Sequence, residues 1–221
     1  MHIAITGNIG AGKTTLAEQL ARHYGWEILH EAVNDNPYLA DFYDDMPRWA
    51  FNLQVFFLNS RFAQVKYIRD VAEANAQHPS QLPRTVVQDR TIYEDAAIFA
   101  RNLADSGDMS QRDYQTYLSL FGNMMSLVQS PDLMIYLRAD LPKLRGQIEK
   151  RGRSFEKTIS NEYLSNLNRL YDQFIAAYTA GPLITLDVNE LDYATRPADF
   201  AEIVRRIDER LNLTPGSLAG S

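Results

Sequence analysis

The chain has 221 residues, of which 45% are apolar and 23% charged, a composition typical of a globular protein with a sizeable core. Its net charge of −6 argues against a general nucleic-acid or anionic-membrane surface. It has no cysteine, which excludes disulfides and thiolate metal sites, and it shows neither a signal-like N-terminus nor a membrane-length apolar run. We therefore expect a soluble, cytoplasmic protein.

Short apolar runs alternate along the chain with long amphipathic segments. Five runs, most with β-branched residues, predict strands over residues 2–6, 27–32, 85–90, 133–138 and 183–188. Helix-length segments cover residues 13–24, 48–77, 92–103, 111–129, 141–150, 161–179 and 196–211. This alternation predicts an α/β fold with a parallel sheet covered by helices. We expect one domain over residues 1–212 and a disordered tail over 213–221.

The first predicted strand leads into a glycine-rich segment that matches G-x-x-x-x-G-K-[ST]: Gly7, Asn8, Ile9, Gly10, Ala11, Gly12, Lys13 and Thr14. Successive backbone N–H groups of such a loop and the start of the next helix form a nest for phosphates. Lys13 brings positive charge to the β/γ-phosphates, and the Thr14 hydroxyl suits a Mg²⁺ ligand. Thr15 is a further, less specific candidate. The segment predicts ATP and Mg²⁺ as cofactors.

A P-loop alone does not name a reaction, because GTPases, motors and several kinds of kinase share it. A GTPase should also carry D-x-x-G, but no glycine in this chain has Asp three positions before it. The segment NELD (189–192) resembles the guanine-reading N-K-x-D, with Glu190 in place of lysine. A regulatory ATPase or GTPase is the less favoured alternative. A nucleoside-monophosphate kinase, which needs cationic groups for the acceptor's own phosphate, is the nearer one.

Charged residues end the second and third predicted strands, at the sheet edge where the P-loop also lies. Glu31 could accept a hydroxyl proton during phosphoryl transfer. Asp89 could hold Mg²⁺ through water, and Arg90 could orient Glu31 or stabilise the transferring group. The alternatives are a solvated carboxylate and a surface ion pair. Thr91 and Glu94 are spaced as a capping box, so we assign Glu94 a structural role.

The segment EKRGRSFE (149–156) gathers basic residues after a predicted helix in an otherwise acidic protein. Arg151 and Arg153, with Gly152 between them and Lys150 before, are typical of a lid that closes positive charge over ATP phosphates. The alternative is a solvated charged face.

Together these segments resemble the deoxynucleoside kinase family, most closely its bacterial deoxyadenosine/deoxyguanosine kinase branch. The resemblance runs from Met1 to about Leu211, through GNIGAGKTT, HEAVNDNPYLADFY, RWAFNLQVFFLNSRF, QDRTIYEDAAIF, RGRSFE and NEYL. It implies a three-layer P-loop NTPase-type fold with a five-stranded parallel sheet, a short Arg-rich lid and a homodimer. It also implies ATP-Mg²⁺-dependent phosphorylation of a deoxynucleoside 5′-OH in nucleotide salvage, with feedback inhibition by a deoxynucleoside triphosphate.

The resemblance also assigns roles residue by residue. Glu31 matches the base at the 5′-OH, Arg90 the arginine beside it, and Asp89 a residue near magnesium. The residues that match sugar and base contacts are Tyr43 and Glu162 at the 3′-OH, and Gln54, Arg61 and Asp95 at the base. Arg151 and Arg153 match the lid arginines. The chain departs from the family at Ala32, where a proline is usual, and at Gln147, where many members have an arginine that Arg145 could replace.

The three base-reading candidates favour a base edge such as adenine N7/N6, and the ranking among deoxyadenosine, deoxyguanosine and deoxycytidine stays open. Gln54 and Arg61 are seven residues apart and share one helix face, but the Gln54 amide fits several bases. Arg61 offers donors only and ionised Asp95 acceptors only, which together suit a ring acceptor beside an amino group. We expect deoxyadenosine first, then deoxyguanosine, with thymidine poor. A buried Arg61–Asp95 salt bridge is a compatible reading, and the aromatic residue that sandwiches the base stays open among Trp49, Phe51, Phe56, Phe57, Phe62 and Phe99.

Overall fold

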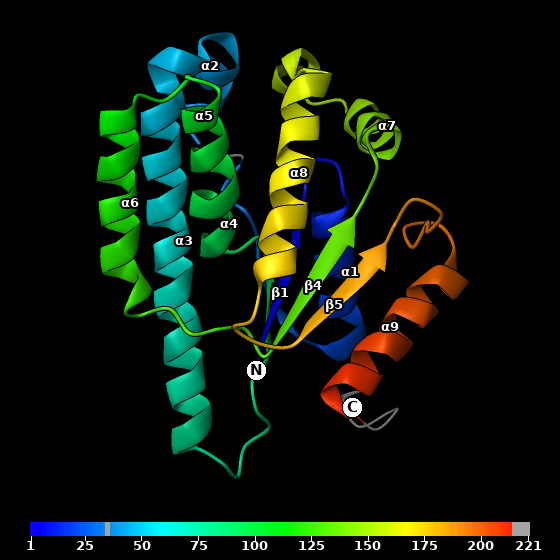
Figure 1. The fold of residues 1–221 in the computed structure, drawn as a ribbon. Coiled ribbons are helices and arrows are strands. Elements are labelled where there is room, and N and C mark those ends of the chain that lie inside the picture. The colour runs from blue at the N-terminus through cyan, green and yellow to red at the C-terminus, as the bar shows by residue number, and fades with distance from the viewer. Residues whose placement is uncertain (34–35, 214–221) are drawn as a thin grey trace.

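The computed structural model describes residues 1–33 and 36–213, so all but the first residue of the predicted disordered tail lies outside the described residues. Five strands form one sheet in the order β2-β3-β1-β4-β5, with every neighbouring pair parallel. The strands are β1 (His2–Gly7), β2 (Glu27–Leu29), β3 (Val86–Asp89), β4 (Leu133–Arg138) and β5 (Leu183–Asp187). The predicted five-stranded parallel sheet is confirmed (Figure 1).

Helices cover both faces of the sheet, which gives three layers (Figure 1). On one face, α1 (Lys13–Tyr24) and α9 (Pro197–Leu211) bury Leu16, Leu20 and Ile203 against β1 and β4. The other face is covered by α3 (Met46–Gln77), α6 (Gln111–Met125) and α8 (Asn161–Ala177). Because both faces are covered, β1 and β4 consist almost entirely of buried residues, as is usual in parallel sheets.

Several elements differ from the prediction. Residues 92–103, predicted as one helix, form α4 (Ile92–Glu94), a π-helical segment η1 (Asp95–Ala100) and α5 (Arg101–Asp105). The short helix α2 (Leu39–Asp44) and the 3₁₀ turn η2 (Ser154–Thr158) were not predicted, and α7 (Leu141–Arg151) extends one residue beyond its predicted end. Helix α3 is a single helix of 32 residues, whose first turn is capped by the Asp45 side chain.

Strand β2 is shorter than predicted. Its last pair with β3 joins Leu29 to Gln88, so Glu31 lies two residues beyond the strand, in an irregular segment. The carboxyl ends of β1, β2 and β3 still bring the P-loop, Glu31 and Asp89 to one edge of the sheet, where open α/β sheets bind ligands.

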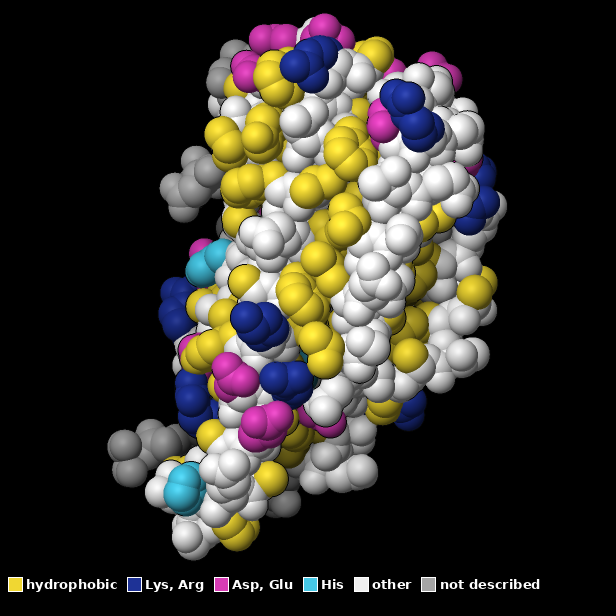
Figure 2. All heavy atoms as spheres, turned by 90° about the vertical axis from the view of Figure 1, so that its left-hand side faces the viewer, with side chains coloured by type: hydrophobic (Ala, Val, Ile, Leu, Met, Phe, Trp, Pro, Cys, Tyr) yellow, Lys and Arg dark blue, Asp and Glu magenta, His cyan; other side chains and the backbone are white. Residues whose placement is uncertain are grey.

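The outer face of α3 and α6 carries a band of apolar side chains (Figure 2). Leu120, on α6, is 38% exposed, and Leu127, just after that helix, is 40% exposed. No helix within the described part of the chain is both long and apolar enough to cross a membrane.

Candidate active site

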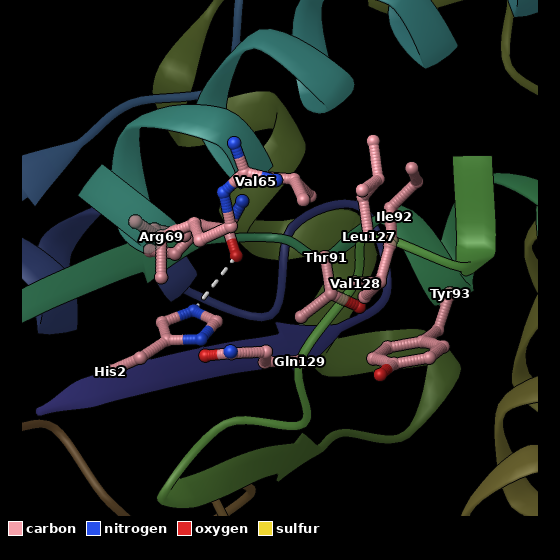
Figure 3. A pocket seen from close by; sticks show the side chains of 11 residues that line it. His2, Val65, Arg69, Thr91, Ile92, Tyr93, Leu127, Val128 and Gln129 are labelled. Carbon is pink, nitrogen blue, oxygen red and sulfur yellow. Dashed lines mark hydrogen bonds between the residues drawn. The ribbon is translucent and has the colours of Figure 1, made fainter. Parts of the chain in front are cut away.

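A cavity of about 840 Å³ opens at the carboxyl edge of the sheet. Its wall includes the P-loop, Glu31, Tyr43, Asp89 and the residues around Arg151. This volume lies within the range of small-ligand sites. A second, much smaller cavity of about 20 Å³ lies near the amino end of β1, beside His2 and Thr91 (Figure 3).

The P-loop is shaped by glycines and tied to neighbouring elements. Gly10 and Gly12 have φ of 85° and 95°, in the left-handed region that favours glycine. The Asn8 amide donates to the Leu164 carbonyl at 3.0 Å, which joins the loop to α8. Lys13 is 7% exposed and donates to the Asn8 carbonyl at 3.0 Å. Burial and the nearby Arg90 lower the pKa of Lys13 to about 8.

Thr14 and Asp89 form an oxygen site beside the P-loop. The Thr14 hydroxyl donates to Asp89 Oδ2 at 2.5 Å, and Asp89 Oδ1 has no hydrogen-bond partner among the described residues. Burial raises the pKa of Asp89 despite the nearby Lys13. A hydroxyl beside a carboxylate with a free oxygen fits the hard oxygen ligands that Mg²⁺ prefers.

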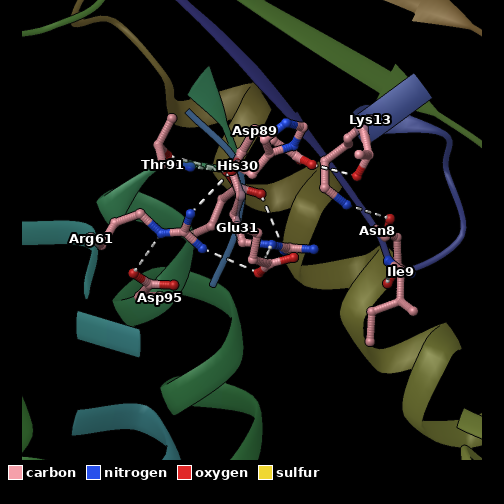
Figure 4. Close-up of polar contacts among 12 residues, drawn as sticks. Asn8, Ile9, Lys13, His30, Glu31, Arg61, Asp89, Thr91 and Asp95 are labelled. Atoms are coloured by element: carbon pink, nitrogen blue, oxygen red, sulfur yellow. Dashed lines mark hydrogen bonds and ion pairs between the residues drawn. The ribbon is translucent and has the colours of Figure 1, made fainter. Parts of the chain in front are cut away.

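Glu31 is held between two arginines (Figure 4). Its Oε1 lies 2.7 Å from Arg90 Nε and 3.1 Å from Arg61 Nη2, while its side chain stays 19% exposed to the cavity. Burial would raise the pKa of Glu31, but Arg90, Arg61 and Lys13 outweigh it and bring the pKa down to about 2. The two arginines and Lys13 thus favour the ionised form of Glu31.

Arg90 is fixed from several sides. Its backbone has a φ of 73°, which is unusual for a residue with a side chain and typical of strained functional positions. Its guanidinium donates to the Tyr171 hydroxyl at 2.6 Å, lies 3.3 Å from Glu94 and covers the Phe99 ring at 4.5 Å. The predicted Thr91–Glu94 capping box is present. Glu94 thus caps α4 and also holds Arg90.

Arg61 and Asp95 form a buried ion pair, with Arg61 Nε 3.4 Å from Asp95 Oδ2. Arg61 also donates to the Asp89 carbonyl at 3.0 Å. Of the base-reading candidates, Gln54 and Asp95 line the large cavity, whereas Arg61 does not; both of its Nη atoms donate, to the Asp89 carbonyl and to Glu31. Gln54 is buried, and its Oε1 has no hydrogen-bond partner among the described residues. Arg61 thus contacts two residues that line the cavity, Glu31 and Asp95.

The two lid arginines converge on one carboxylate. Arg151 donates to Glu156 from Nε at 3.0 Å and from Nη2 at 2.6 Å, and Arg153 Nη1 lies 3.5 Å away from it. Arg145 does not reach the cavity wall, because it donates to the Ile159 carbonyl and to Asn161. Gln147 and Lys150 line the cavity instead.

Glu162, which the resemblance pairs with Tyr43 at the sugar 3′-OH, does not line the cavity with Tyr43. Glu162 is exposed in the first turn of α8, whereas Tyr163 and the buried Glu156 line the cavity. Tyr43 stacks on Phe155 at 5.9 Å, and burial together with Tyr163 and Glu156 raises its pKa. The turn η2, which follows the lid arginines, carries Glu156 inward.

Two of the six candidate aromatic residues line the cavity, Phe57 and Phe99. Phe42 and Phe155, which were not candidates, line it as well. The cavity therefore has aromatic walls as well as charged groups.

Comparisons with known proteins agree with this geometry. A family model described as deoxynucleoside kinase matches residues 3–212. The chain is 38% identical to a deoxyadenosine/deoxycytidine kinase of Bacillus subtilis over 207 residues, 93% of this chain and 90% of that protein. It is 44% identical to a deoxyadenosine kinase of Dictyostelium discoideum, over 92% of this chain and 78% of that protein.

A solved structure is similar to this chain in fold as well as in sequence. The deoxyadenosine kinase from M. mycoides, with dCMP and dCDP bound, superposes with a TM-score of 0.80 at 31% identity, over 95% of this chain and 100% of that one. The family model and these relatives span nearly the whole chain, as the sequence resemblance predicted. The chain belongs to the deoxynucleoside kinase family.

Proposed function

We propose that the protein transfers the γ-phosphoryl group of ATP to the 5′-OH of a deoxynucleoside, with deoxyadenosine preferred over deoxyguanosine, in cytoplasmic nucleotide salvage. The observation that carries this proposal is the position of Glu31. Its carboxylate lies 2.7 Å from Arg90, in the cavity that the P-loop also lines. A carboxylate fixed beside the phosphate-binding loop is placed to receive the proton of an attacking hydroxyl.

The residues divide the chemistry between them. Glu31 orients the 5′-OH and accepts its proton; a weak base suffices, because a loose phosphoryl-transfer transition state makes little demand on base strength. Lys13, Arg90 and the lid pair Arg151 and Arg153 stabilise the charge on the transferring group. Thr14 and Asp89 would hold Mg²⁺, which would supply further charge neutralisation at the phosphates. The residues assigned to ATP binding are Gly7, Asn8, Ile9, Gly10, Ala11, Gly12, Lys13, Thr14 and Thr15.

On the acceptor side, we assign the sugar 3′-OH to Tyr43 and Glu156, because Glu156 occupies the cavity wall where Glu162 was expected. Gln54, with an unpartnered Oε1, and Asp95 are placed to read the base edge. Phe57 and Phe99 are the aromatic residues available to stack on it. An M. mycoides relative has been solved with bound dATP, which supports feedback inhibition by a deoxynucleoside triphosphate here.

We also propose a homodimer formed through the apolar face of α3 and α6 (Figure 2). Exposed leucines such as Leu120 favour burial against a second copy. Sedimentation equilibrium should give twice the chain mass, and Leu120→Glu should lower it. An unchanged dimer mass for the variant would place the interface elsewhere.

Initial rates test the reaction directly. The four deoxynucleosides, adenosine and dAMP serve as acceptors with ATP-Mg²⁺, for the wild type, Glu31→Gln and the exposed control Glu73→Gln. We expect fast phosphorylation of deoxyadenosine, little of thymidine, and a fall of roughly 10²–10⁴-fold for Glu31→Gln alone. Phosphorylation of dAMP in preference to deoxyadenosine would indicate a nucleoside-monophosphate kinase. Phosphate release without any acceptor would indicate an ATPase.

A further inference from the structure

We infer that Gln64 on α3 is a positioning residue for Glu31, because it holds the backbone of the preceding residue, His30, at the end of a hydrogen-bonded chain that begins at His2. The inference rests on the catalytic role proposed for Glu31. Gln64 does not line the large cavity, so it acts through Glu31 and not on the substrate.

The segment that carries Glu31 needs such support. Strand pairing ends at Leu29, so the sheet does not fix His30 or Glu31. The backbone hydrogen bond from Val33 N to the Glu31 carbonyl, at 2.9 Å, is local and does not tie the segment to the sheet. A carboxylate on an untethered backbone could not keep a fixed position beside Arg90.

Helix α3 holds the segment at two points. The Gln64 amide donates from Nε2 to the His30 carbonyl at 2.7 Å. Arg61, three residues earlier on the same helix face, holds the Glu31 carboxylate at 3.1 Å. Gln64 therefore fixes the backbone where Arg61 fixes the side chain, and the two contacts together define where the carboxylate lies.

Gln64 is itself oriented by a chain across the sheet. Gln88 on β3 donates from Nε2 to Gln64 Oε1 at 2.8 Å, and its Oε1 lies 3.0 Å from His2 Nε2. Because the His30 carbonyl can only accept, each amide in the chain has one permitted orientation, and His2 must donate from Nε2.

The start of the chain is suited to this task. The His2 ring borders the small cavity beside Arg69 and Thr91 (Figure 3). Burial lowers the pKa of His2 to about 4, so the ring is neutral near pH 7 and keeps a single N–H for Gln88. The direction of the chain is thus stable across the physiological range.

A shift of the His30 backbone would move Glu31 relative to the attacking hydroxyl, and phosphoryl transfer is sensitive to such displacements. The P-loop is held by separate contacts, including that of Asn8 with α8. Loss of the Gln64 contact should therefore lower kcat and leave the KM for ATP unchanged.

The test compares Gln64→Met, which keeps the side-chain length and removes the donor, with the control Gln77→Met on the exposed last turn of α3. We expect kcat for deoxyadenosine to fall about tenfold for Gln64→Met, which is the effect of losing one hydrogen bond, with the KM for ATP unchanged. Gln77→Met should match the wild type. Thermal unfolding of each variant establishes that it is folded.

Two further measurements separate positioning from stability. In single-turnover experiments, Gln64→Met should not lower the rate further when Glu31 is already replaced by Gln. A residue that acts through Glu31 has no carboxylate left to position in that variant. Gln64→Glu keeps the length and loses the donor when ionised. Its kcat relative to wild type should recover towards pH 5, as the protonated carboxyl again donates to His30, while the ratio for Gln64→Met stays flat. The titratable groups around this position are His2, His30, Glu31 and Arg61.

If the wild type is active and Gln64→Met has the same kcat, the inference is overturned and the role of Glu31 stays intact. The inference is also overturned if Gln64→Met lowers the rate of the Glu31→Gln variant as much as it lowers that of the wild type. An inactive wild type would instead refute the proposed function itself.

Discussion

Asp95 provides a test of how the buried charges are balanced. Its side chain is 3% exposed and pairs with Arg61 at 3.4 Å. Burial raises the pKa of Asp95 from its ordinary value of 3.8 to about 7, against the opposing effect of Arg61 and Arg90. The folded protein therefore prefers the neutral form of this carboxyl, whereas the unfolded chain ionises it above about pH 4. The perturbation that removes this titration is Asp95→Asn.

The direction of the pH dependence follows from the linkage between proton binding and folding. A carboxyl with a raised folded pKa favours the folded state fully below its unfolded pKa, and this contribution is lost as the pH rises through the folded pKa. Between pH 5 and 7 the folded wild type binds about one proton more than the unfolded chain. Its free energy of unfolding therefore falls by ~1.4 kcal/mol per pH unit in this range. The free energy of unfolding of the wild type should thus fall by about 2–3 kcal/mol between pH 5 and 8, relative to Asp95→Asn. Glu31, with its pKa lowered to about 2, loses its contribution only at more acidic pH.

Urea unfolding at pH 5 and pH 8 measures this difference. The other titrating groups cancel between the wild type and Asp95→Asn, because the two chains differ at one side chain. The exposed control Asp105→Asn should track the wild type at both pH values. If the wild type and Asp95→Asn show the same change in unfolding free energy between the two pH values, Asp95 is already ionised at pH 5 and the reasoning from burial is refuted.

Two further predictions concern the phosphate loop and the lid. Gly12→Ala should abolish ATP binding in calorimetry, because the added Cβ would lie 2.1 Å from the Tyr193 hydroxyl at a φ of 95°; Gly122→Ala, with open space, should bind normally. Wild-type affinity in Gly12→Ala would show that Tyr193 moves freely. Glu156→Gln should raise the KM for deoxyadenosine by about tenfold, through loss of a charge-assisted hydrogen bond to the sugar. A change in the KM for ATP alone would assign Glu156 to the donor side only.

The parts of the fold set by local pattern could be predicted from the sequence. Helix α1 begins and ends at the predicted residues, since Gly12 precedes Lys13 and Gly25 follows Tyr24 in left-handed conformations that end a helix. The Thr91–Glu94 capping box also depends only on spacing. Such features need no knowledge of distant contacts.

The remaining features depend on tertiary contacts. The π-helical turn at 95–100 adds a residue per turn where Asp95 meets Arg61 from another helix, and helix periodicity cannot predict it. Glu156 and Glu162 are both acidic residues near the lid, and only the fold of η2 shows which one faces the cavity. Similarly, the end of β2 at Leu29 depends on pairing with β3, which the sequence pattern that predicted a strand over residues 27–32 does not contain.

Burial, opposed by Arg61 and Arg90, raises the pKa of Asp95 within a group of charges at the sheet edge. Three basic side chains, Lys13, Arg61 and Arg90, lie among four acidic ones, Glu31, Asp89, Glu94 and Asp95. A buried charge without a partner is costly, so an excess carboxyl is stabilised by taking up a proton.

Burial raises the pKa of two of these carboxyls, Asp89 and Asp95, the latter to about 7, while the basic side chains lower that of Glu31 to about 2. Glu31 keeps its charge because both Arg61 and Arg90 contact it. In the mechanism that we propose, Glu31 is therefore ionised and oriented before the acceptor arrives, and the protein need not reorganise at the moment of transfer. In the proposed base site, the neutral form of Asp95 would donate a hydrogen bond to a base edge. Base recognition should accordingly change with pH near 7, whereas proton acceptance by Glu31 should not.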